Sequence, residues 1–332
     1  MRGNQRSALL AACAVIGAAL VWSTSYAVTK KVLGGVGPLT IGAIRFTLAA
    51  AVLHVVMRLR RRGGSGCGAR PDARQRRAMY RSGLLGITAY FIFENIGVQL
   101  STATDASLIV ATYPLMTMLL ERAVLRTSVP WHRVGGVLLA AAGAALVVRG
   151  GHDAGGSDRL LGDALLMAAG LTWAGYSIVA KSAGLKQDPV TLTYYQTLAG
   201  AAGFLLASLV EAPQWKVPSA GDVLLLVYLA AACSVGGFLL YNYGLRTMSS
   251  SAAVNVMNIV PVCGVLSAVL IDGERVSLPQ VLGGAVIIAG VTLGMLDRAP
   301  APSPAASEAA ALFEQVDTSA PGVPLEPLTA RR

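Results

Sequence analysis

The hydrophobic positions of this chain form long uninterrupted runs instead of the alternating pattern of a membrane β-barrel. A helix needs roughly 20 mostly apolar residues to cross a bilayer, and only helices or closed barrels satisfy the backbone polar groups there. Ten such runs fall near residues 8–28, 38–57, 82–100, 103–123, 131–148, 160–180, 190–210, 223–245, 250–271 and 276–296. The pattern therefore predicts an all-α integral membrane protein with ten transmembrane helices.

The overall composition agrees with lipid as the solvent of this chain. Hydrophobic residues make up 54% of the 332 residues and charged residues only 13%, and the mean hydropathy is +0.60. Soluble domains carry about 25% charged residues. The lipid bilayer is thus the first partner that the sequence predicts.

The formal net charge of +10 would favour nucleic-acid binding in a soluble chain, but its distribution indicates a membrane loop. Nine arginines are concentrated around the connection between the second and third runs: Arg58, Arg60, Arg61, Arg62, Arg70, Arg74, Arg76, Arg77 and Arg81. Short loops rich in Lys and Arg remain cytoplasmic under the positive-inside rule. We therefore expect no nucleic-acid partner and assign this loop to the cytoplasmic side.

The remaining charges orient the whole chain. An even number of helices puts both ends on one side, and a cytoplasmic N-terminus at residues 1–7 leaves few basic residues outside. These outer residues are Lys30, Lys31, Arg149, Arg159, Lys216 and Arg275. Residues 299–332 are rich in Pro, Ala and Ser, so we expect a disordered cytoplasmic tail.

The chain contains an internal repeat. An offset of 147 residues aligns several identical pairs, among them Asn95 with Asn242, Pro114 with Pro261, Gly136 with Gly283, and Gly143 with Gly290. An offset of 151 residues places Trp22 on Trp173 and Lys30 on Lys181. The first run also ends in a small-x-small motif typical of signal-peptide cleavage, but a removed segment would have no counterpart in the second half.

The repeat defines a domain organisation. The first half covers 8–149, an extracytoplasmic linker covers 150–159, and the second half covers 160–298. Because each half holds an odd number of helices, the second half must enter the membrane with the opposite orientation. In many secondary transporters such inverted repeats enclose the substrate site near the bilayer midplane and exchange inward-facing and outward-facing states.

Several short motifs resemble the EamA branch of the drug/metabolite transporter superfamily. They are Trp22-Ser23-Thr24-Ser25-Tyr26-Ala27 with Lys30, Arg45-Phe46, Ala106-Ser107-Leu108-Ile109 before Pro114, and Gly273-Glu274-Arg275. The resemblance covers residues 8–298 and implies a ten-helix carrier in the bacterial inner membrane, with a central cavity, that often exports amino acids or related metabolites. The acidic loop motif stands only in the second half, since the first half has Leu125-Arg126-Thr127 there.

Ionisable residues inside spans are costly and usually face the protein interior. The four candidates are Arg45, His54, Glu94 and Asp105. Arg45 and Glu94 are predicted at similar depths on consecutive helices, which permits an ion pair that locks the helices. The alternatives are that Arg45 snorkels outwards or binds a substrate carboxylate, and that Glu94 couples protons. We interpret Asp105 as an outer-rim residue.

Polar and aromatic residues within the spans are candidates for lining the substrate cavity. They are Trp22, Tyr26, Tyr90, Asn95, Tyr113, Trp173, Tyr176, Tyr194, Gln196, Tyr241, Asn242, Asn255 and Asn258. Asparagines in hydrocarbon also serve as interhelical hydrogen-bonding groups, and aromatic residues near helix ends also serve as interfacial anchors. Pro114 and Pro261 are candidate hinges for alternating access, or simple helix kinks.

Other chemistry is not indicated by the sequence. The four cysteines are scattered, without a metal-binding spacing, so we expect neither a metal nor another cofactor. Motifs of hydrolases and nucleotide-driven pumps are missing, so an enzyme is disfavoured. The predicted function is a secondary transporter, in the export direction, for a small molecule with or without a coupled proton or ion. A non-transporting sensor or assembly subunit is the alternative, and a membrane enzyme a weaker one.

Overall fold

The computed structural model describes residues 2–62, 71–125, 131–150, 156–182, 188–244, 256–257 and 259–295. The chain divides into two units, Met1–Met295 and Leu296–Arg332, and every described residue belongs to the first. The predicted tail at 299–332 therefore lies outside the described residues, as do Asn255 and Asn258.

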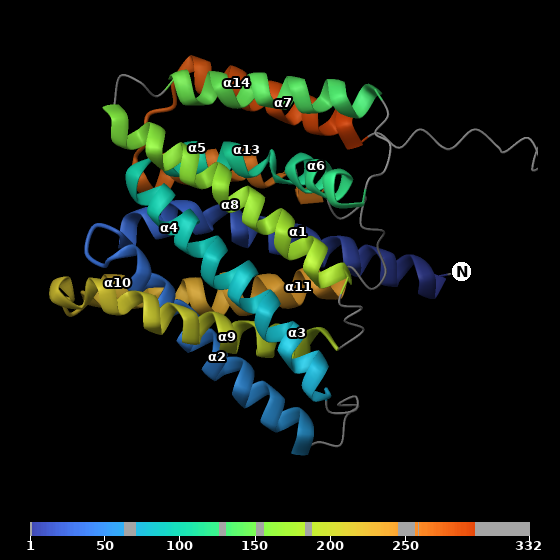
Figure 1. Cartoon of the computed structure of the whole chain (residues 1–332), viewed down its shortest axis with the longest axis vertical. Helices are drawn as coiled ribbons and strands as arrows, with labels where there is room; N and C mark the ends of the chain where they lie inside the picture. The colour runs from blue at the N-terminus through green and yellow to red at the C-terminus, as the bar shows by residue number, and fades with distance from the viewer. Residues whose placement is uncertain are drawn as a thin grey trace, which may run out of the picture. The chain divides into compact units, whose positions relative to one another are not determined.

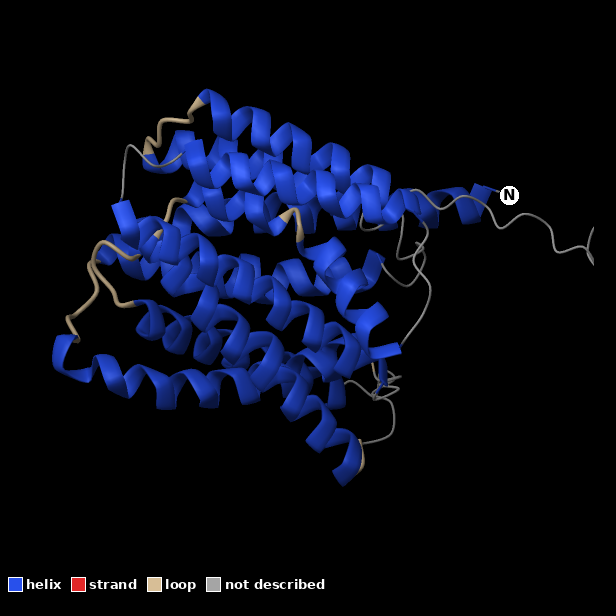
Figure 2. Ribbon diagram, turned by 45° about the horizontal axis from the view of Figure 1, so that its top comes forward, coloured by secondary structure: helices blue, strands red, loops and turns tan. Residues whose placement is uncertain are grey.

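Helices form the regular structure of the described chain (Figures 1 and 2). The α-helices are α1 (Arg2–Val32), α2 (Pro38–Arg62), α3 (Ala73–Gly83), α4 (Tyr90–Leu100), α5 (Ala103–Val110), α6 (Tyr113–Leu125), α7 (Trp131–Gly150), α8 (Gly156–Ser182), α9 (Pro189–Ser208), α10 (Ala220–Tyr228), α11 (Gly237–Gly244), α13 (Ile259–Ser267) and α14 (Leu278–Met295). Wider π-helical turns are η1 (Leu84–Ala89), η4 (Leu229–Gly236) and η5 (Ala268–Asp272), and η3 (Leu209–Gln214) is a 3₁₀ helix.

Four described helical stretches are long and apolar enough to cross a membrane: Leu9–Val32, Pro38–Arg62, Ala73–Leu100 and Ala220–Tyr241. A fifth is the pair α5 and α6, which is bent by 43°. Shorter apolar helices cover Val134–Gly150, Ile259–Asp272 and Leu278–Gly294. Helices α8 and α9 are not among these apolar stretches, and both contain several polar residues. With them, the described segments form an all-α bundle at the ten predicted positions, which confirms the predicted fold class.

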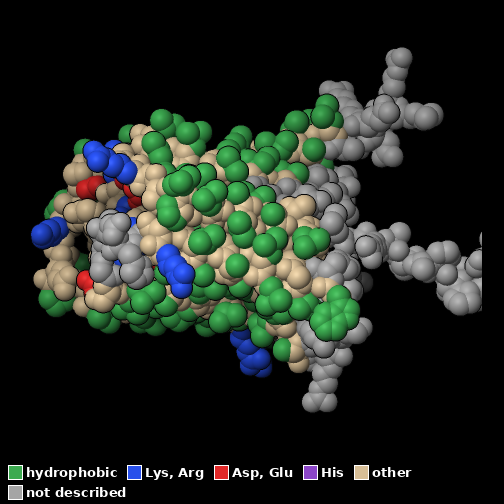
Figure 3. All heavy atoms as spheres, turned by 90° about the horizontal axis from the view of Figure 1, so that it is seen from above, with side chains coloured by type: hydrophobic (Ala, Val, Ile, Leu, Met, Phe, Trp, Pro, Cys, Tyr) green, Lys and Arg blue, Asp and Glu red, His purple; other side chains and the backbone are tan. Residues whose placement is uncertain are grey.

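The exposed outer surface of the helical bundle is largely apolar. Large hydrophobic side chains remain exposed along several helices, including Leu138, Leu206, Leu224 and Leu270. Figure 3 shows one face of the molecule on which hydrophobic side chains predominate, with the visible acidic side chains towards one end. Because a soluble monomer rarely exposes so much contiguous apolar surface, this surface matches a lipid environment.

The tightest contact between the halves joins α7 to α14, the last helix of each half, which lie side by side in Figure 1. A Cβ atom added to Gly143 would lie 2.7 Å from the carbonyl oxygen of Gly283, and one added to Gly290 would lie 2.7 Å from that of Gly136. Only glycine permits so close an approach of two helix backbones. Since Gly136 is equivalent to Gly283 and Gly143 to Gly290, each contact is the mirror of the other under exchange of halves.

A second reciprocal contact joins α2 to α9, again equivalent helices. The Arg60 guanidinium at the end of α2 pairs with Asp188, the N-cap residue of α9, at 2.8 Å. At the other end, the Glu211 carboxylate after α9 accepts hydrogen bonds from the backbone N–H groups of Leu39 and Thr40 in the first turn of α2, at 2.9 and 2.8 Å. The end of each helix therefore satisfies the start of its partner, as an inverted repeat requires.

The π-helical turns repeat the same relation. Leu84–Ala89 and Leu229–Gly236 interrupt the third segment of each half at places that correspond under the 147-residue offset. The described connections α1 to α2, α4 to α5, α9 to α10 and α13 to α14 lie at the end of the bundle away from the N-terminus (Figures 1 and 2). Contact pattern and topology both describe two interlocked inverted five-helix repeats.

Candidate functional site

A pocket lies where elements of both halves meet. Its lining residues are Phe46, Gly86, Ile87, Trp173, Tyr176, Thr193, Gln196, Thr197, Ser234 and Phe238. They come from α2 and η1 of the first half and from α8, α9, η4 and α11 of the second half. Four aromatic rings and several neutral hydrogen-bonding groups surround the space. Of the predicted cavity residues, Trp173, Tyr176 and Gln196 line this pocket.

Hydrogen bonds and ring contacts fix one side of the pocket. The Gln196 amide nitrogen lies 3.0 Å from Ser82 Oγ and 3.3 Å from the Tyr176 hydroxyl, so it donates towards both. Trp173 packs between two tyrosines, with ring centroids 5.4 Å from Tyr90 and 5.3 Å from Tyr176. Because these side chains hold one another, this wall is preorganised for a ligand.

The two π-helical turns bring the remaining wall into place. Gly86 lies in η1, and a Cβ atom added there would meet the Tyr176 ring at 2.5 Å, so only glycine lets the turn approach α8. Ser234 lies in η4 and faces the pocket from the opposite half. Short π-helical insertions in α-helices occur frequently at functional sites, and here both border the same space.

Arg45 is buried next to this pocket. Only 2% of the residue is exposed, so it does not snorkel to the membrane surface as one alternative held. Its Nε donates to Ser234 Oγ at 2.7 Å, and its guanidinium carbon lies 4.7 Å from the Phe91 ring centroid. The Nη1 atom is buried and has no hydrogen-bond partner in the part of the chain that the structure describes. The buried Arg45 side chain is therefore hydrogen-bonded to the Ser234 hydroxyl, which lines the pocket.

Arg45 and Glu94 do not form, among the described residues, the ion pair that their similar depths permit. Arg45 is hydrogen-bonded to Ser234. The buried Glu94 carboxylate is hydrogen-bonded to the Tyr90 side chain and interacts with Arg45 electrostatically, without a hydrogen bond. Equal depth along two helices did not bring the guanidinium and the carboxylate together, because each of them has a nearer polar partner. Tyr26 and Tyr113 complete a buried hydroxyl cluster around Tyr90.

Trp22 binds the second half directly. Its indole N–H donates to the carbonyl oxygen of Cys233 in η4 at 2.9 Å. Its ring packs on Phe238 and Tyr241, with centroid distances of 5.3 and 5.4 Å. Trp22 and Tyr241 therefore support the wall that carries Ser234, and neither lines the pocket itself.

Of the four asparagine candidates, the structure describes the side chain of Asn95 only. Asn95 donates its amide N–H to the carbonyl oxygen of Pro38 at 2.9 Å, which ties α4 to the start of α2. This contact favours the interhelical interpretation over the cavity-lining one. The side chain of Asn242 lies outside the described residues, together with Asn255 and Asn258.

The two remaining ring-bearing candidates, Tyr194 and His54, and the two prolines lie away from the pocket lining. His54 Nδ1 and the Tyr194 hydroxyl are 3.0 Å apart in an exposed contact between α2 and α9. Pro114 stands in the first turn of α6, directly after the 43° bend, and Pro261 in the first turn of α13 as described. Bending at Pro114 is thus a feature of the fold, while the hinge function of both prolines stays a prediction.

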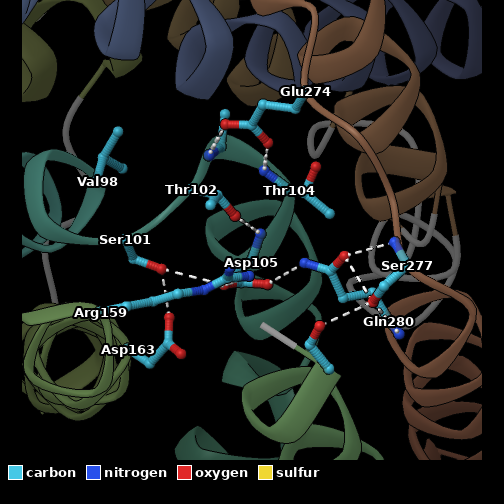
Figure 4. A network of polar contacts seen from close by, with 12 residues as sticks. Val98, Ser101, Thr102, Thr104, Asp105, Arg159, Asp163, Glu274, Ser277 and Gln280 are labelled. Atoms are coloured by element: carbon cyan, nitrogen blue, oxygen red, sulfur yellow. Dashed lines mark hydrogen bonds and ion pairs between the residues drawn. The ribbon is translucent and has the colours of Figure 1, made fainter. Parts of the chain in front are cut away.

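Asp105 is not an outer-rim residue, which corrects the sequence interpretation. It is 0% exposed and forms an ion pair with Arg159, whose Nη2 lies 2.5 Å from its Oδ2. Gln280 donates to its other oxygen at 2.8 Å (Figure 4). Ser101 Oγ joins this group to Asp163 at 2.5 Å. Arg159 was assigned to an outer loop, but α8 already begins at Gly156, so its charge is turned into the bundle.

Two further residues close the same end of the bundle. The Glu274 carboxylate accepts hydrogen bonds from the backbone N–H groups of Ala103 and Thr104 at 2.8 and 2.9 Å, which caps the start of α5 (Figure 4). Lys30 Nζ donates to the carbonyl oxygens of Val98 and Ser101 at the end of α4. Charges of the right sign thus meet the two helix ends.

Sequence reasoning missed several members of these networks, namely Ser234, Arg159, Asp163 and Gln280. The only available signal was the presence of charges in or next to apolar runs, which singled out Asp105 but not its partner. A serine within an Ala-rich run carries no such signal. Its position beside Arg45 depends on how η4 packs against α2.

Comparisons with known proteins agree with this architecture. Residues 9–149 and 160–296 each match the EamA-like transporter family. An uncharacterized transporter of Archaeoglobus fulgidus is 27% identical over 82% of this chain and 93% of its own length. A probable terminal-alkyne amino-acid exporter of Streptantibioticus cattleyicolor is 25% identical over 82% of this chain and 89% of its own length. A solved crystal structure of a protein shares the fold, with a TM-score of 0.63 and 22% identity over 86% of this chain and 98% of that one.

Proposed function

Because the chain belongs to the EamA-like transporter family, we propose that it is a secondary transporter that exports a small metabolite by alternating access. The substrate binds in the pocket between Trp173, Gln196 and Ser234. The observation that carries the proposal is the reciprocal packing of equivalent helices, α7 with α14 and α2 with α9, together with a pocket that residues of both halves line. Exchanging the conformations of the two halves would open the same pocket to the opposite side.

An amino acid or a related compound is the substrate class that we propose. The relative from Streptantibioticus cattleyicolor that is named a probable terminal-alkyne amino-acid exporter supports this choice. The mixed pocket of aromatic rings and neutral hydrogen-bonding groups suits a molecule with both apolar and polar parts. Relatives are named as transporters, so no catalytic step is proposed.

We further propose an inner-membrane location with both termini cytoplasmic. The end of α2 and the whole of α3 present exposed arginines, among them Arg58, Arg61, Arg74 and Arg77. The connections at the other end of the bundle contain few basic residues. This asymmetry supports the orientation under the positive-inside rule, and reporter fusions to each end of the chain would test it.

Transport by the purified protein is the direct test of the proposed function. Metabolite profiling of knockout and overexpressing cells first selects compounds whose export depends on the protein. Proteoliposomes loaded with these compounds are then expected to release them faster than empty-membrane controls. The proposal fails if no selected compound moves under any ion or substrate gradient while the protein remains folded.

Glu94 allows a prediction on proton coupling. Replacement of Glu94 by Gln is expected to abolish any pH dependence of transport, because the amide keeps the contact with Tyr90 but binds no titrating proton. The charged and titratable groups that interact with this position are Arg45, Tyr26, Tyr90, Tyr113 and Cys233. Initial rates between acidic and alkaline pH would be compared for the two proteins. An unchanged pH profile in folded Glu94→Gln would exclude Glu94 as the coupling site.

A further inference from the structure

We propose that Ser234 and Arg45 form the subsite that binds a carboxylate group of the substrate, the Ser234 hydroxyl making the contact and Arg45 supplying the charge. The inference rests on the proposed transport function and narrows its substrate class to small carboxylates with an apolar body. It follows from the hydrogen bond between the two residues, the free donors around it, and the lining of the pocket.

The direction of the hydrogen bond decides what Ser234 offers to a ligand. Arg45 Nε can only donate, so Ser234 Oγ accepts at 2.7 Å and keeps its own O–H proton. Among the described residues, no acceptor for this proton is found. Since Ser234 lines the pocket, its hydroxyl is a donor that awaits an acceptor on the substrate.

Charge then selects the kind of acceptor. The guanidinium group polarises the serine O–H, and such charge-assisted hydrogen bonds are strongest with an anionic oxygen. The buried Nη1 atom of Arg45 also lacks a hydrogen-bond partner within the described ranges. Glu94 is hydrogen-bonded to Tyr90, which does not line the pocket, whereas Arg45 is hydrogen-bonded to the pocket-lining Ser234. A carboxylate there would offset the cost of burying Arg45.

The second half lacks this charge at the equivalent position. The offset of 151 residues that aligns Trp22 with Trp173 places Gln196 opposite Arg45. Gln196 lines the pocket but is neutral and donates to Ser82 and Tyr176. The pocket is therefore polarised, with a cationic side at Ser234 and a neutral, aromatic side at Trp173 and Tyr176. A carboxylate attached to an apolar body fits this arrangement.

A matched pair of probes tests the subsite. Binding of 4-methylpentanoate and of its neutral amide, 4-methylpentanamide, would be measured by calorimetry or thermal stabilisation of the purified protein. The carboxylate is expected to bind more tightly than the amide to the wild-type protein. Ser234→Ala is expected to weaken carboxylate binding about tenfold or more, because it removes a hydrogen bond to a charged group, and to weaken amide binding by a smaller factor, because a hydrogen bond to a neutral carbonyl contributes less. Ser234→Thr, which keeps the hydroxyl, should retain the preference.

Two further variants separate charge from folding. Arg45→Gln is expected to abolish the difference between the two probes, and Arg45→Lys to retain part of it, since lysine keeps the charge. Ser208→Ala serves as the control, because Ser208 is also buried but its hydroxyl donates only to Leu205 of its own helix, away from the pocket. This control should bind both probes as the wild type does.

The result that overturns the inference is equal binding of acid and amide by the wild type, absence of carboxylate binding, or an undiminished preference in folded Ser234→Ala. These measurements use detergent-solubilised protein and need no transport. A protein that binds carboxylates through Ser234 but moves nothing in liposomes would contradict the proposed function alone. A protein that exports only compounds without a carboxylate group would retain the function and refute the subsite.

Discussion

Replacement of Asp105 by Ala is expected to destabilise the protein by about 3–5 kcal/mol, the cost of removing one partner of a buried ion pair. Asp105 is completely buried, and its carboxylate accepts hydrogen bonds from Arg159 and Gln280. Removal leaves the Arg159 guanidinium in a site with little access to solvent. Thermal unfolding in detergent would measure the loss as a clear decrease in the midpoint temperature.

The neighbouring Asp158 provides the matched control. It lies on the same helix as Arg159 but is exposed, so Asp158→Ala should change stability by less than about 0.5 kcal/mol. A milder Asp105→Asn variant keeps the shape and one hydrogen-bonding oxygen, and its loss should lie between the two. Wild-type stability of Asp105→Ala would mean that the ion pair contributes nothing to the folded state.

The same ion pair also has a consequence for transport. Asp105, Arg159 and Gln280 connect α5, α8 and α14 at the end of the bundle that also holds the Lys30 and Glu274 contacts (Figure 4). Under alternating access this end must separate in one state. Variants that break the pair are expected to favour the state open at this end, which would appear as faster labelling of a cysteine introduced near the pocket.

Substitution of Gly143 by Ala is expected to cost about 1–3 kcal/mol, the range for overpacking a well-filled interior. The added Cβ atom would lie 2.7 Å from the backbone carbonyl oxygen of Gly283 and 2.7 Å from the backbone nitrogen of Ile287, and neither atom can move without displacing α14. The equivalent Gly290 should behave in the same way, because its Cβ atom would meet the backbone of Gly136 and Ala140. Thermal unfolding again measures the effect.

Gly135, on the same helix, separates this steric effect from helix propensity. A Cβ atom at Gly135 would have its nearest neighbour at 4.0 Å, in the Leu293 side chain, which is ordinary contact. Gly135→Ala should therefore be neutral or stabilising by up to about 1 kcal/mol, the propensity difference between the two residues. Equal behaviour of the Gly135 and Gly143 variants would refute the close helix approach.

The architecture could be predicted from the sequence because its causes are local or periodic. A bilayer requires continuous apolar helices, and the number of runs with the distribution of arginines sets the topology. The repeated glycines and prolines predicted equivalent helices, and the structure pairs Gly136 with Gly290 and Gly143 with Gly283. Residues such as Trp173 and Gln196 were also recognised, since polar or aromatic groups in a span need a reason to be there.

Only the tertiary structure decided which of these groups meet. Arg45 and Glu94 were matched by depth, but the π-helical turn η4 brings Ser234 to Arg45 and Tyr90 holds Glu94. Depth along a helix follows from counting residues, whereas the direction of a side chain depends on the rotation and packing of neighbouring helices. Asp105 illustrates the same limit, since its burial depends on Arg159 approaching from another helix. The sequence by itself therefore determined the membrane fold and its repeat, and packing between helices determined the pairs of residues that form the site.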